Sequence, residues 1–434
     1  MQPETGVEVS PQLKDAGAGA VRATHTAQAW LVRAFSVWES PLWAGLLALV
    51  VYALITVAFG AFNRVSPFPY YNWQADAFLH GHLDLVNPPQ AHDLSLFQGR
   101  YYLYWGPVPS ILLLPFVAIF GAGVSDIDFT VVLGAVSVAL VALMLRQADR
   151  RGVAPTSPLQ RSLLVLFFAF GTVMMTLAPF GRVWFTGQVV GVACVALAYV
   201  VALTFRGPAA FFLTGLALAF AMFTRNQLVL TGLWPAYYLL ETHWPLTWRR
   251  FLSLAAVGLL PLVLALGMQG AYNAARFGRP LDTGIAYHDM DPRFRDDVQR
   301  YGVFNLHYVQ FNFPYQYVAY PLPMNDKSYE GGSLFLLSPV FLAAFWGIAA
   351  GRPRRSVYVL LATIALGVVT VLLFMGTGWV QIGPRYTLDF TIPLLLLTAM
   401  GVRRWPIWAL AVTTALSVIQ YLAALRYLGD AFKF

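Results

Sequence analysis

The sequence predicts an all-α, polytopic membrane protein. Of its 434 residues, 58% are hydrophobic and only 11% are charged, which lies outside the range of soluble globular domains. Apolar runs of about twenty residues, the length that crosses a bilayer as a helix, recur along the whole chain. The single cysteine, Cys194, lies inside one of these runs, so a disulfide framework and a thiolate metal site are both excluded.

Residues 1–40 are expected to form a cytoplasmic segment ahead of the membrane domain. The first long apolar run, 41–62, comes too late and is too long for the h-region of a cleavable signal peptide. Within the segment, 21–38 is a candidate amphipathic helix that carries Arg22 and Arg33 and lies on the inner leaflet. The net charge of +8 indicates contact with membrane lipids rather than with nucleic acid, because the arginines are scattered between the apolar runs.

Eleven spans form one integral membrane domain over residues 41–425, and 426–434 remains as a short external tail. The spans are placed at 41–62, 127–146, 162–180, 187–205, 208–223, 227–240, 251–273, 332–350, 356–375, 386–401 and 405–424. Residues 107–121 are also apolar, but they are shorter than a normal span and begin with prolines. We therefore expect a helix there that lies at the interface without crossing.

The placement of arginine sets the orientation. If 107–121 does not cross, the short loops that carry most arginines, such as those with Arg150, Arg250 and Arg404, all fall on the cytoplasmic side. The N-terminus is then inside and the C-terminus outside. Two long loops, 63–126 and 274–331, are external and hold many of the polar residues.

The first external loop is rich in aromatic and acidic residues. Residues 70–79 are predicted to form an amphipathic helix. A turn at Gly99, a proline-rich aromatic stretch over 104–109 and an apolar segment ending at Phe120-Gly121 follow. A chain this hydrophobic has little use for a long polar loop unless the loop has a function.

Two motifs in the C-terminal half complete a recognisable layout. Gly383-Pro384-Arg385-Tyr386 opens the tenth span and is followed by Pro393, and Asn273-Ala274-Ala275-Arg276-Phe277-Gly278 leaves the seventh. With the first loop, they resemble the GT-C superfamily of polyprenyl-phosphate-dependent glycosyltransferases, in particular its bacterial protein O-mannosyltransferase-like members. The resemblance covers about residues 40–400.

The resemblance implies a GT-C-like fold of about eleven transmembrane helices with interfacial helices in a large first external loop. It also implies an enzyme of the bacterial inner (plasma) membrane that moves a hexosyl or pentosyl group on the external face. The donor would be a polyprenyl-phosphate sugar, the acceptor an envelope glycan, lipid or protein, and no cofactor is implied. Two alternatives are a transporter or flippase for lipid-linked sugars and a non-catalytic envelope-assembly protein of the same fold.

Sugar transfer of this kind needs a carboxylate that takes the proton from the acceptor hydroxyl. Asp76 and Asp93 are the candidates. The plainer interpretation of Asp76 is an ordinary solvated residue, whereas Asp93 lies in irregular structure, where binding residues concentrate. The Asp-Glu pair of the resembled family is absent, since Pro67-Phe68 stands at its position. Either the base has moved to Asp76 or Asp93, or the chain has lost transferase activity. Asp76 is favoured, because a helix holds a base more rigidly than the loop around Asp93 does.

Three arginines at span mouths, Arg225, Arg276 and Arg385, are predicted to bind the donor phosphate. A cation at such a position is costly unless it is paired or holds an anion, and the guanidinium fork fits a phosphate. Two plainer interpretations stay open. Arg385 would pair with Asp389, four residues on along the same helix, and Arg225 would be an interfacial anchor.

Four further residues of the first loop are predicted to bind substrate. Tyr101, Tyr102 and Trp105 offer aromatic faces on which a pyranose stacks, and His92 lies beside them in the chain. The alternative for the aromatic residues is an interfacial belt. No metal site is predicted, because the histidines lack a ligand pattern and the acidic stretch 289–297 is interpreted as a solvated loop.

Overall fold

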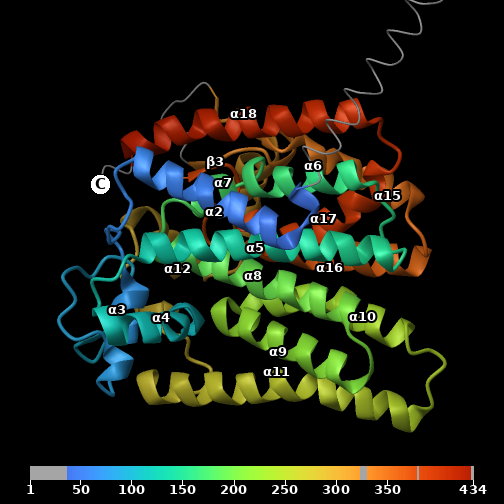
Figure 1. Cartoon of the computed structure of the whole chain (residues 1–434). Coiled ribbons are helices and arrows are strands. Elements are labelled where there is room, and N and C mark those ends of the chain that lie inside the picture. The colour runs from blue at the N-terminus through green and yellow to red at the C-terminus, as the bar shows by residue number, and fades with distance from the viewer. Residues whose placement is uncertain (1–36, 323–329, 379–380, 432–434) are drawn as a thin grey trace, which may run out of the picture.

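The computed structural model describes residues 37–322, 330–378 and 381–431. Its helices lie side by side in a bundle around a large apolar core (Figure 1). The segment 1–40 and its amphipathic helix lie almost wholly outside the described residues, which begin with the 3-10 turn η1 (Val37–Glu39). At the other terminus the last helix continues to Ala431, so the tail expected from residue 426 begins inside a helix.

Among the described residues, seven helices are long and apolar enough to cross a membrane, so the protein is a multi-pass membrane protein. They are α2 (Pro41–Ala58), α5 (Asp126–Arg150), α8 (Val183–Thr204), α9 (Gly207–Thr224), α11 (Trp248–Phe277), α16 (Arg354–Leu373) and α18 (Ile407–Ala431). Each coincides with a predicted span. The sequence expectation of a polytopic helical fold is confirmed.

The other four predicted spans are also helical, but they are short or interrupted. They are α6 (Pro158–Phe170) with α7 (Met174–Leu177), η2 (Asn226–Gly232) with α10 (Leu233–Glu241), α14 (Leu334–Leu337) with η6 (Pro339–Leu342) and α15 (Ala343–Ala350), and η7 (Arg385–Thr387) with α17 (Leu388–Val402). Proline or glycine stands at each break or start, for example Gly171 after α6 and Pro339 after α14.

The eleven helical segments alternate between two ends of the bundle. One end, here named the loop end, carries residues 59–125, 278–322 and 330–333 and lies on the left in Figure 1. At the opposite end, the arginine end, the described linkers between helices are short, and the arginines there include Arg150, Arg250 and Arg404.

The remaining elements belong to the loop end. They are α3 (Tyr70–Leu79), β1 (Ser95–Phe97), β2 (Arg100–Tyr102), α4 (Val108–Phe120), η3 (Ile285–Tyr287), α12 (Pro292–Tyr301), η4 (Leu306–Tyr308), α13 (Val309–Phe313), η5 (Pro314–Val318), β3 (Glu330–Gly331) and β4 (Gln381–Ile382). The helix expected over 70–79 has those bounds.

Helix α4 does not carry the chain to the arginine end. Its 13 residues rise about 20 Å, less than the roughly 30 Å of a hydrocarbon core. The segments on either side of it also meet, because the Asn63 N–H donates to the Asp128 carboxylate (3.0 Å) and the Ser66 N–H to Asp126 (2.7 Å). Helix α2 therefore ends where α5 begins.

Helices α8 and α17 form the centre of the bundle, and small residues let their neighbours approach closely. A Cβ on Gly401 of α17 would lie 1.8 Å from the carbonyl oxygen of Ala343 in α15, so only glycine fits there. Close backbone contact of this kind replaces the hydrophobic driving force that helices lack in lipid. A second apolar cluster under the first loop, which includes Tyr70, Leu94 and Leu113, holds the loop elements on the bundle.

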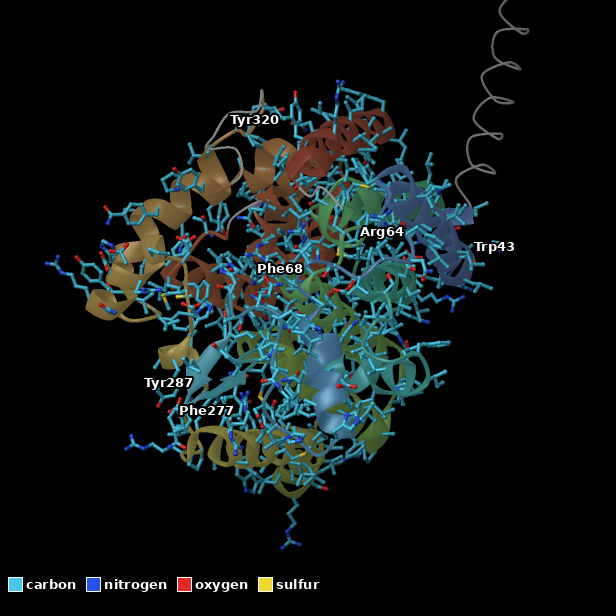
Figure 2. The ribbon with its side chains drawn as sticks, turned by 90° about the vertical axis from the view of Figure 1, so that its left-hand side faces the viewer. Trp43, Arg64, Phe68, Phe277, Tyr287 and Tyr320 are labelled. Carbon is cyan, nitrogen blue, oxygen red and sulfur yellow. The ribbon has the colours of Figure 1, made fainter. Side chains whose placement is uncertain are left out.

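The two long loops are joined to each other. The Asp93 N–H donates to the Asp289 carbonyl (3.1 Å), and the Asp289 N–H donates to the Leu94 carbonyl (2.8 Å). Ser95 of the β1–β2 hairpin also forms an antiparallel bridge with His288. Figure 2 looks onto this loop end and shows Phe68 near its middle.

Candidate functional site

A cavity of about 710 Å³ opens at the loop end. Its walls come from the first loop, the start of α8, the turn after α9, the end of α11, the second loop and the residues around η7. The volume lies within the range of about 300–1,000 Å³ that small-molecule sites occupy. Segments far apart in the sequence therefore enclose one space.

Asp93 is held in this cavity by two side chains. The indole Nε1 of Trp184 donates to Oδ2 (2.9 Å), and Nε2 of His288 lies 3.0 Å from Oδ1. The ring of His92 is also near, with its Nε2 3.8 Å from Oδ2. The backbone of Asp93 has φ +60°, a left-handed conformation that Asp adopts more readily than most residues. The carboxylate is 17% exposed, so it is largely buried yet reachable from the cavity.

Aromatic rings surround Asp93. The Tyr104 ring lies 4.1 Å from that of Trp105 and 4.6 Å from the His288 ring, measured between centroids. Phe68 packs against Trp184 at 4.8 Å. Burial, and secondarily the charge of Asp93, raise the pKa of Tyr104 well above its usual value, so its hydroxyl stays a hydrogen-bond donor.

Arg385 lies in the cavity wall and is 6% exposed. Its guanidinium lies over the rings of Tyr386 (4.8 Å) and Phe185 (5.7 Å), and Nη2 is 3.4 Å from the Tyr386 hydroxyl. Within the described part of the chain no carboxylate pairs with Arg385, and its Nε has no hydrogen-bond partner. A buried cation in this state is costly unless an anion binds it.

Asp389 pairs with Arg225 and not with Arg385, contrary to the structural pair considered from the sequence. Nη2 of Arg225 donates to Oδ2 of Asp389 (3.0 Å), and Gln227 donates to the same oxygen (2.8 Å). Burial lowers the pKa of Arg225, but the charge and hydrogen bond of Asp389, together with Tyr386 and Tyr71, raise it by more in sum, so Arg225 stays a cation. The ion pair joins the turn after α9 to α17.

Arg276 also lines the cavity, but its nitrogens are largely engaged. Nη1 donates to the Leu103 carbonyl (2.7 Å) and Nη2 to the Asn273 side chain (2.9 Å). The guanidinium lies 3.7 Å from the centroid of the Tyr272 ring. Arg276 therefore fixes the first loop to the end of α11 and leaves only Nε without a partner in the described structure.

The structure brings six of the nine predicted site residues to one cavity. These are His92, Asp93, Trp105, Arg225, Arg276 and Arg385. Asp76 lies outside the cavity, on α3, where it is 46% exposed and faces His80 at 3.7 Å. Of the two candidate bases, Asp93 lines the cavity and Asp76 does not.

Tyr101 and Tyr102 do not line the cavity either. Tyr101 lies on the β2 strand and packs on the apolar cluster under the first loop. Tyr102 is buried edge-on against Phe277, 5.2 Å between ring centroids. Alternation along a strand places the two side chains on opposite faces of the hairpin, and neither face is the cavity wall.

Sequence reasoning missed Trp184 and His288, which hold Asp93. Trp184 lies in the first turn of α8, and His288 lies in the second loop. Neither belongs to a local motif, so no signal short of the tertiary contact identifies them. Asp291 also lines the cavity. The described residues contain no group of three or more His, Cys, Asp or Glu side chains that could hold a metal ion.

Comparisons with known proteins identify the fold. Neither a protein-family model nor a curated protein sequence matches the chain. ArnT from Cupriavidus metallidurans in the apo state has a similar structure, with a TM-score of 0.52 and 14% identity, over 85% of this chain and 61% of ArnT. ArnT bound to undecaprenyl phosphate gives 0.48 and 15%, over 84% and 61%. The Archaeoglobus fulgidus oligosaccharyltransferase gives 0.43 and 12%, over 90% and 55%.

At these sequence identities the structural similarity shows the fold alone. The fold assignment rests on the match to apo ArnT, whose TM-score is above 0.5. The chain has a GT-C-like fold, as expected from the sequence. It spans about 61% of the length of ArnT.

Proposed function

We propose that this protein is a membrane glycosyltransferase that moves a sugar from a polyprenyl-phosphate donor to an acceptor of the cell envelope. The observation that carries the proposal is that one cavity is lined by both Asp93 and Arg385. Trp184 and His288 fix the Asp93 carboxylate, and the buried Arg385 has no carboxylate partner among the described residues. The GT-C-like fold is compatible with it. ArnT, whose fold is similar, has been crystallised with undecaprenyl phosphate.

Arg385 is the proposed ligand of the donor phosphate. Its buried guanidinium needs an anion, and it presents parallel N–H groups that match two phosphate oxygens. Arg225 supports the same phosphate as a fixed charge, because its ion pair with Asp389 leaves its Nε without a partner in the described structure. Arg276 contributes charge to the wall while its Nη atoms hold the first loop.

Asp93 is the proposed general base. As the acceptor hydroxyl attacks the anomeric carbon of the sugar, the carboxylate takes its proton. The bond between that carbon and the phosphate oxygen breaks, and the phosphate leaves with the bonding electrons, where arginine stabilises its charge. Trp184 and His288 each contact a different oxygen of the Asp93 carboxylate. Each oxygen therefore keeps a second lone pair that can accept the proton.

The aromatic wall is the proposed sugar-binding surface. Trp105 and Tyr104 offer apolar faces next to the Asp93 carboxylate, and a pyranose needs such a face together with hydrogen-bonding groups. The Tyr104 hydroxyl remains a donor because burial raises its pKa. Tyr101 and Tyr102 have no place in this surface, since neither lines the cavity.

The test compares two aspartates of the same loop. Purified protein is incubated with undecaprenyl-phosphate hexoses and pentoses and with envelope fractions, and the release of undecaprenyl phosphate is measured. Asp93→Asn preserves shape and removes basicity, so turnover is expected to fall roughly 10²–10⁴-fold with little change in donor binding. Asp76→Asn is the matched control and should retain activity, because Asp76 lies outside the cavity.

Full turnover in Asp93→Asn would end the assignment of the base. Loss of turnover in Asp76→Asn alone would restore the assignment favoured by the sequence. If wild-type protein binds undecaprenyl phosphate but transfers none of the sugars offered, the non-catalytic alternative gains support, and the donor-binding part of the proposal remains.

A further inference from the structure

A second cavity, of about 310 Å³, lies at the arginine end. Three exposed arginines stand around it: Arg352 follows α15, and Arg403 and Arg404 follow α17. The rest of its lining is Gly152, Val153, Pro155, Ala350, Gly351 and Met400. This arginine cavity therefore has a strongly cationic rim, and none of the described acidic side chains lines it.

The three guanidinium groups lack counter-charges in the part of the chain that the structure describes. Like charges around one small space repel each other unless an anion lies between them. The nearby carboxylate of Asp149 is already engaged by Arg161, at 2.8 Å.

Arginines at this end also donate to backbone carbonyls, and Arg352 of the cavity donates to the Gly351 carbonyl (2.9 Å). Arg354 donates to the Ala349 carbonyl (2.8 Å), and Arg151 donates to the Leu203 carbonyl (2.8 Å). Such contacts cap the carbonyl ends of helices. The arginine cavity differs from these sites in having an open space between its cations.

The depth of the cavity in the membrane is indicated by tryptophan. Trp405 directly follows Arg404 and packs edge-on against Trp346, with 5.5 Å between the centroids. Trp408, at the start of α18, is 68% exposed. Tryptophan gathers where the hydrocarbon core meets the headgroups. The cavity therefore lies at the level of lipid phosphates.

We propose that the arginine cavity binds the phosphate of an anionic phospholipid headgroup in the adjacent leaflet. The cationic rim meets the phosphate, and the apolar residues of the lining contact the glycerol part. Basic pockets between transmembrane helices bind headgroups in this manner. The site is at the opposite end of the bundle from Asp93 and does not depend on transferase activity.

The experiment is a titration of the purified full-length protein with cardiolipin, phosphatidylglycerol or phosphatidylcholine, followed by native mass spectrometry. The double variant Arg403→Gln, Arg404→Gln is compared with Arg249→Gln, Arg250→Gln. The control pair is exposed, belongs to the same end at the start of α11 and carries the same charge, but does not line the cavity.

Wild-type protein and the control variant are expected to bind cardiolipin and phosphatidylglycerol in preference to phosphatidylcholine. The Arg403/Arg404 variant should lose about 30-fold in affinity, since each arginine near anionic headgroups contributes a factor of roughly five. Equal losses in both variants would show a diffuse surface charge and overturn the proposal, as would no loss in either. Thermal denaturation of both variants without lipid confirms that they are folded.

A separate arm distinguishes the lipid from a free anion. Inorganic phosphate at 10 mM is added to the cardiolipin titration. If the wild-type protein still binds cardiolipin, the cavity is a phospholipid site. If phosphate displaces cardiolipin from the wild type but not from the Arg403/Arg404 variant, the cavity is assigned to a free anion and the lipid proposal is overturned.

Discussion

Replacing Arg385 by methionine is expected to have opposite effects on the empty protein and on the protein with a bound phosphate. Removing a buried charge that lacks a counter-ion gains several kcal/mol, which we take as about 3–4. The same change removes two cation–π contacts, with Phe185 and Tyr386, of about 1 kcal/mol each. The empty variant should therefore be more stable than the wild type by roughly 1–2 kcal/mol.

With the ligand the sign reverses. Hydrogen bonds to charged groups contribute about 1.5–3 kcal/mol each. Loss of two such bonds from Arg385 weakens phosphate binding by a factor on the order of 10²–10⁴. Arg385→Lys keeps the charge and loses the planar fork, so it should bind with intermediate affinity.

Thermal denaturation in detergent measures both effects in one series. Each protein is heated alone and with increasing undecaprenyl phosphate, and decyl phosphate serves as a short-chain probe. At a ligand concentration of 100 Kd the wild type gains about 2.7 kcal/mol of stability. At that concentration Arg385→Met should gain almost nothing.

Two results would refute this reasoning. If empty Arg385→Met is clearly less stable than the wild type, the guanidinium is a structural group with a counter-charge in the native membrane. If the variant retains the full stabilisation by undecaprenyl phosphate, the phosphate binds elsewhere.

Two further predictions concern neighbours of Arg385. Asp389→Ala leaves Arg225 buried and unpaired and should lower the free energy of unfolding by about 3–5 kcal/mol, as measured by the same denaturation; an unchanged midpoint would contradict the ion pair's role. Gly378 has φ +86°, and a Cβ there would lie 2.7 Å from Nε of Arg385, so Gly378→Ala should weaken undecaprenyl phosphate binding about tenfold. Gly121→Ala is the matched control, since Gly121 also has a positive φ (+75°) but a Cβ there meets no atom within 4 Å; equal binding by both variants would refute the prediction.

The positions of the helices were predictable because an apolar run of membrane length has few structural solutions. Backbone groups in lipid must be satisfied within the segment, which leaves the helix as the solution for such runs. The interruptions were harder to predict. The span expected over 332–350 breaks at Ser338-Pro339, where the Ser338 hydroxyl donates to the Gly171 carbonyl of another interrupted span, a contact that no local pattern encodes.

The sequence indicated which residue types belong to the candidate site, but not which side chains each of them contacts. Arg225 and Arg385 stood out because cations at span mouths are costly, and both line the cavity. The alternative interpretation, in which Arg385 pairs with Asp389, was wrong, because Asp389 pairs with Arg225 from another segment. Asp76 was favoured for the rigidity of its helix, but which side of that helix faces the cavity depends on how the loop docks on the bundle.

The joint between the two long loops has a consequence for when the site forms. Asp93 is held by His288, 195 residues later in the chain, and the arginine proposed to face it comes later still. A ribosome delivers these segments in order, so a nascent chain that has inserted only its first spans has the aspartate but neither its histidine partner nor a closed cavity. The pocket therefore forms only after Arg385 has been synthesised, and fragments that end before the second loop should fold helices without acquiring a site.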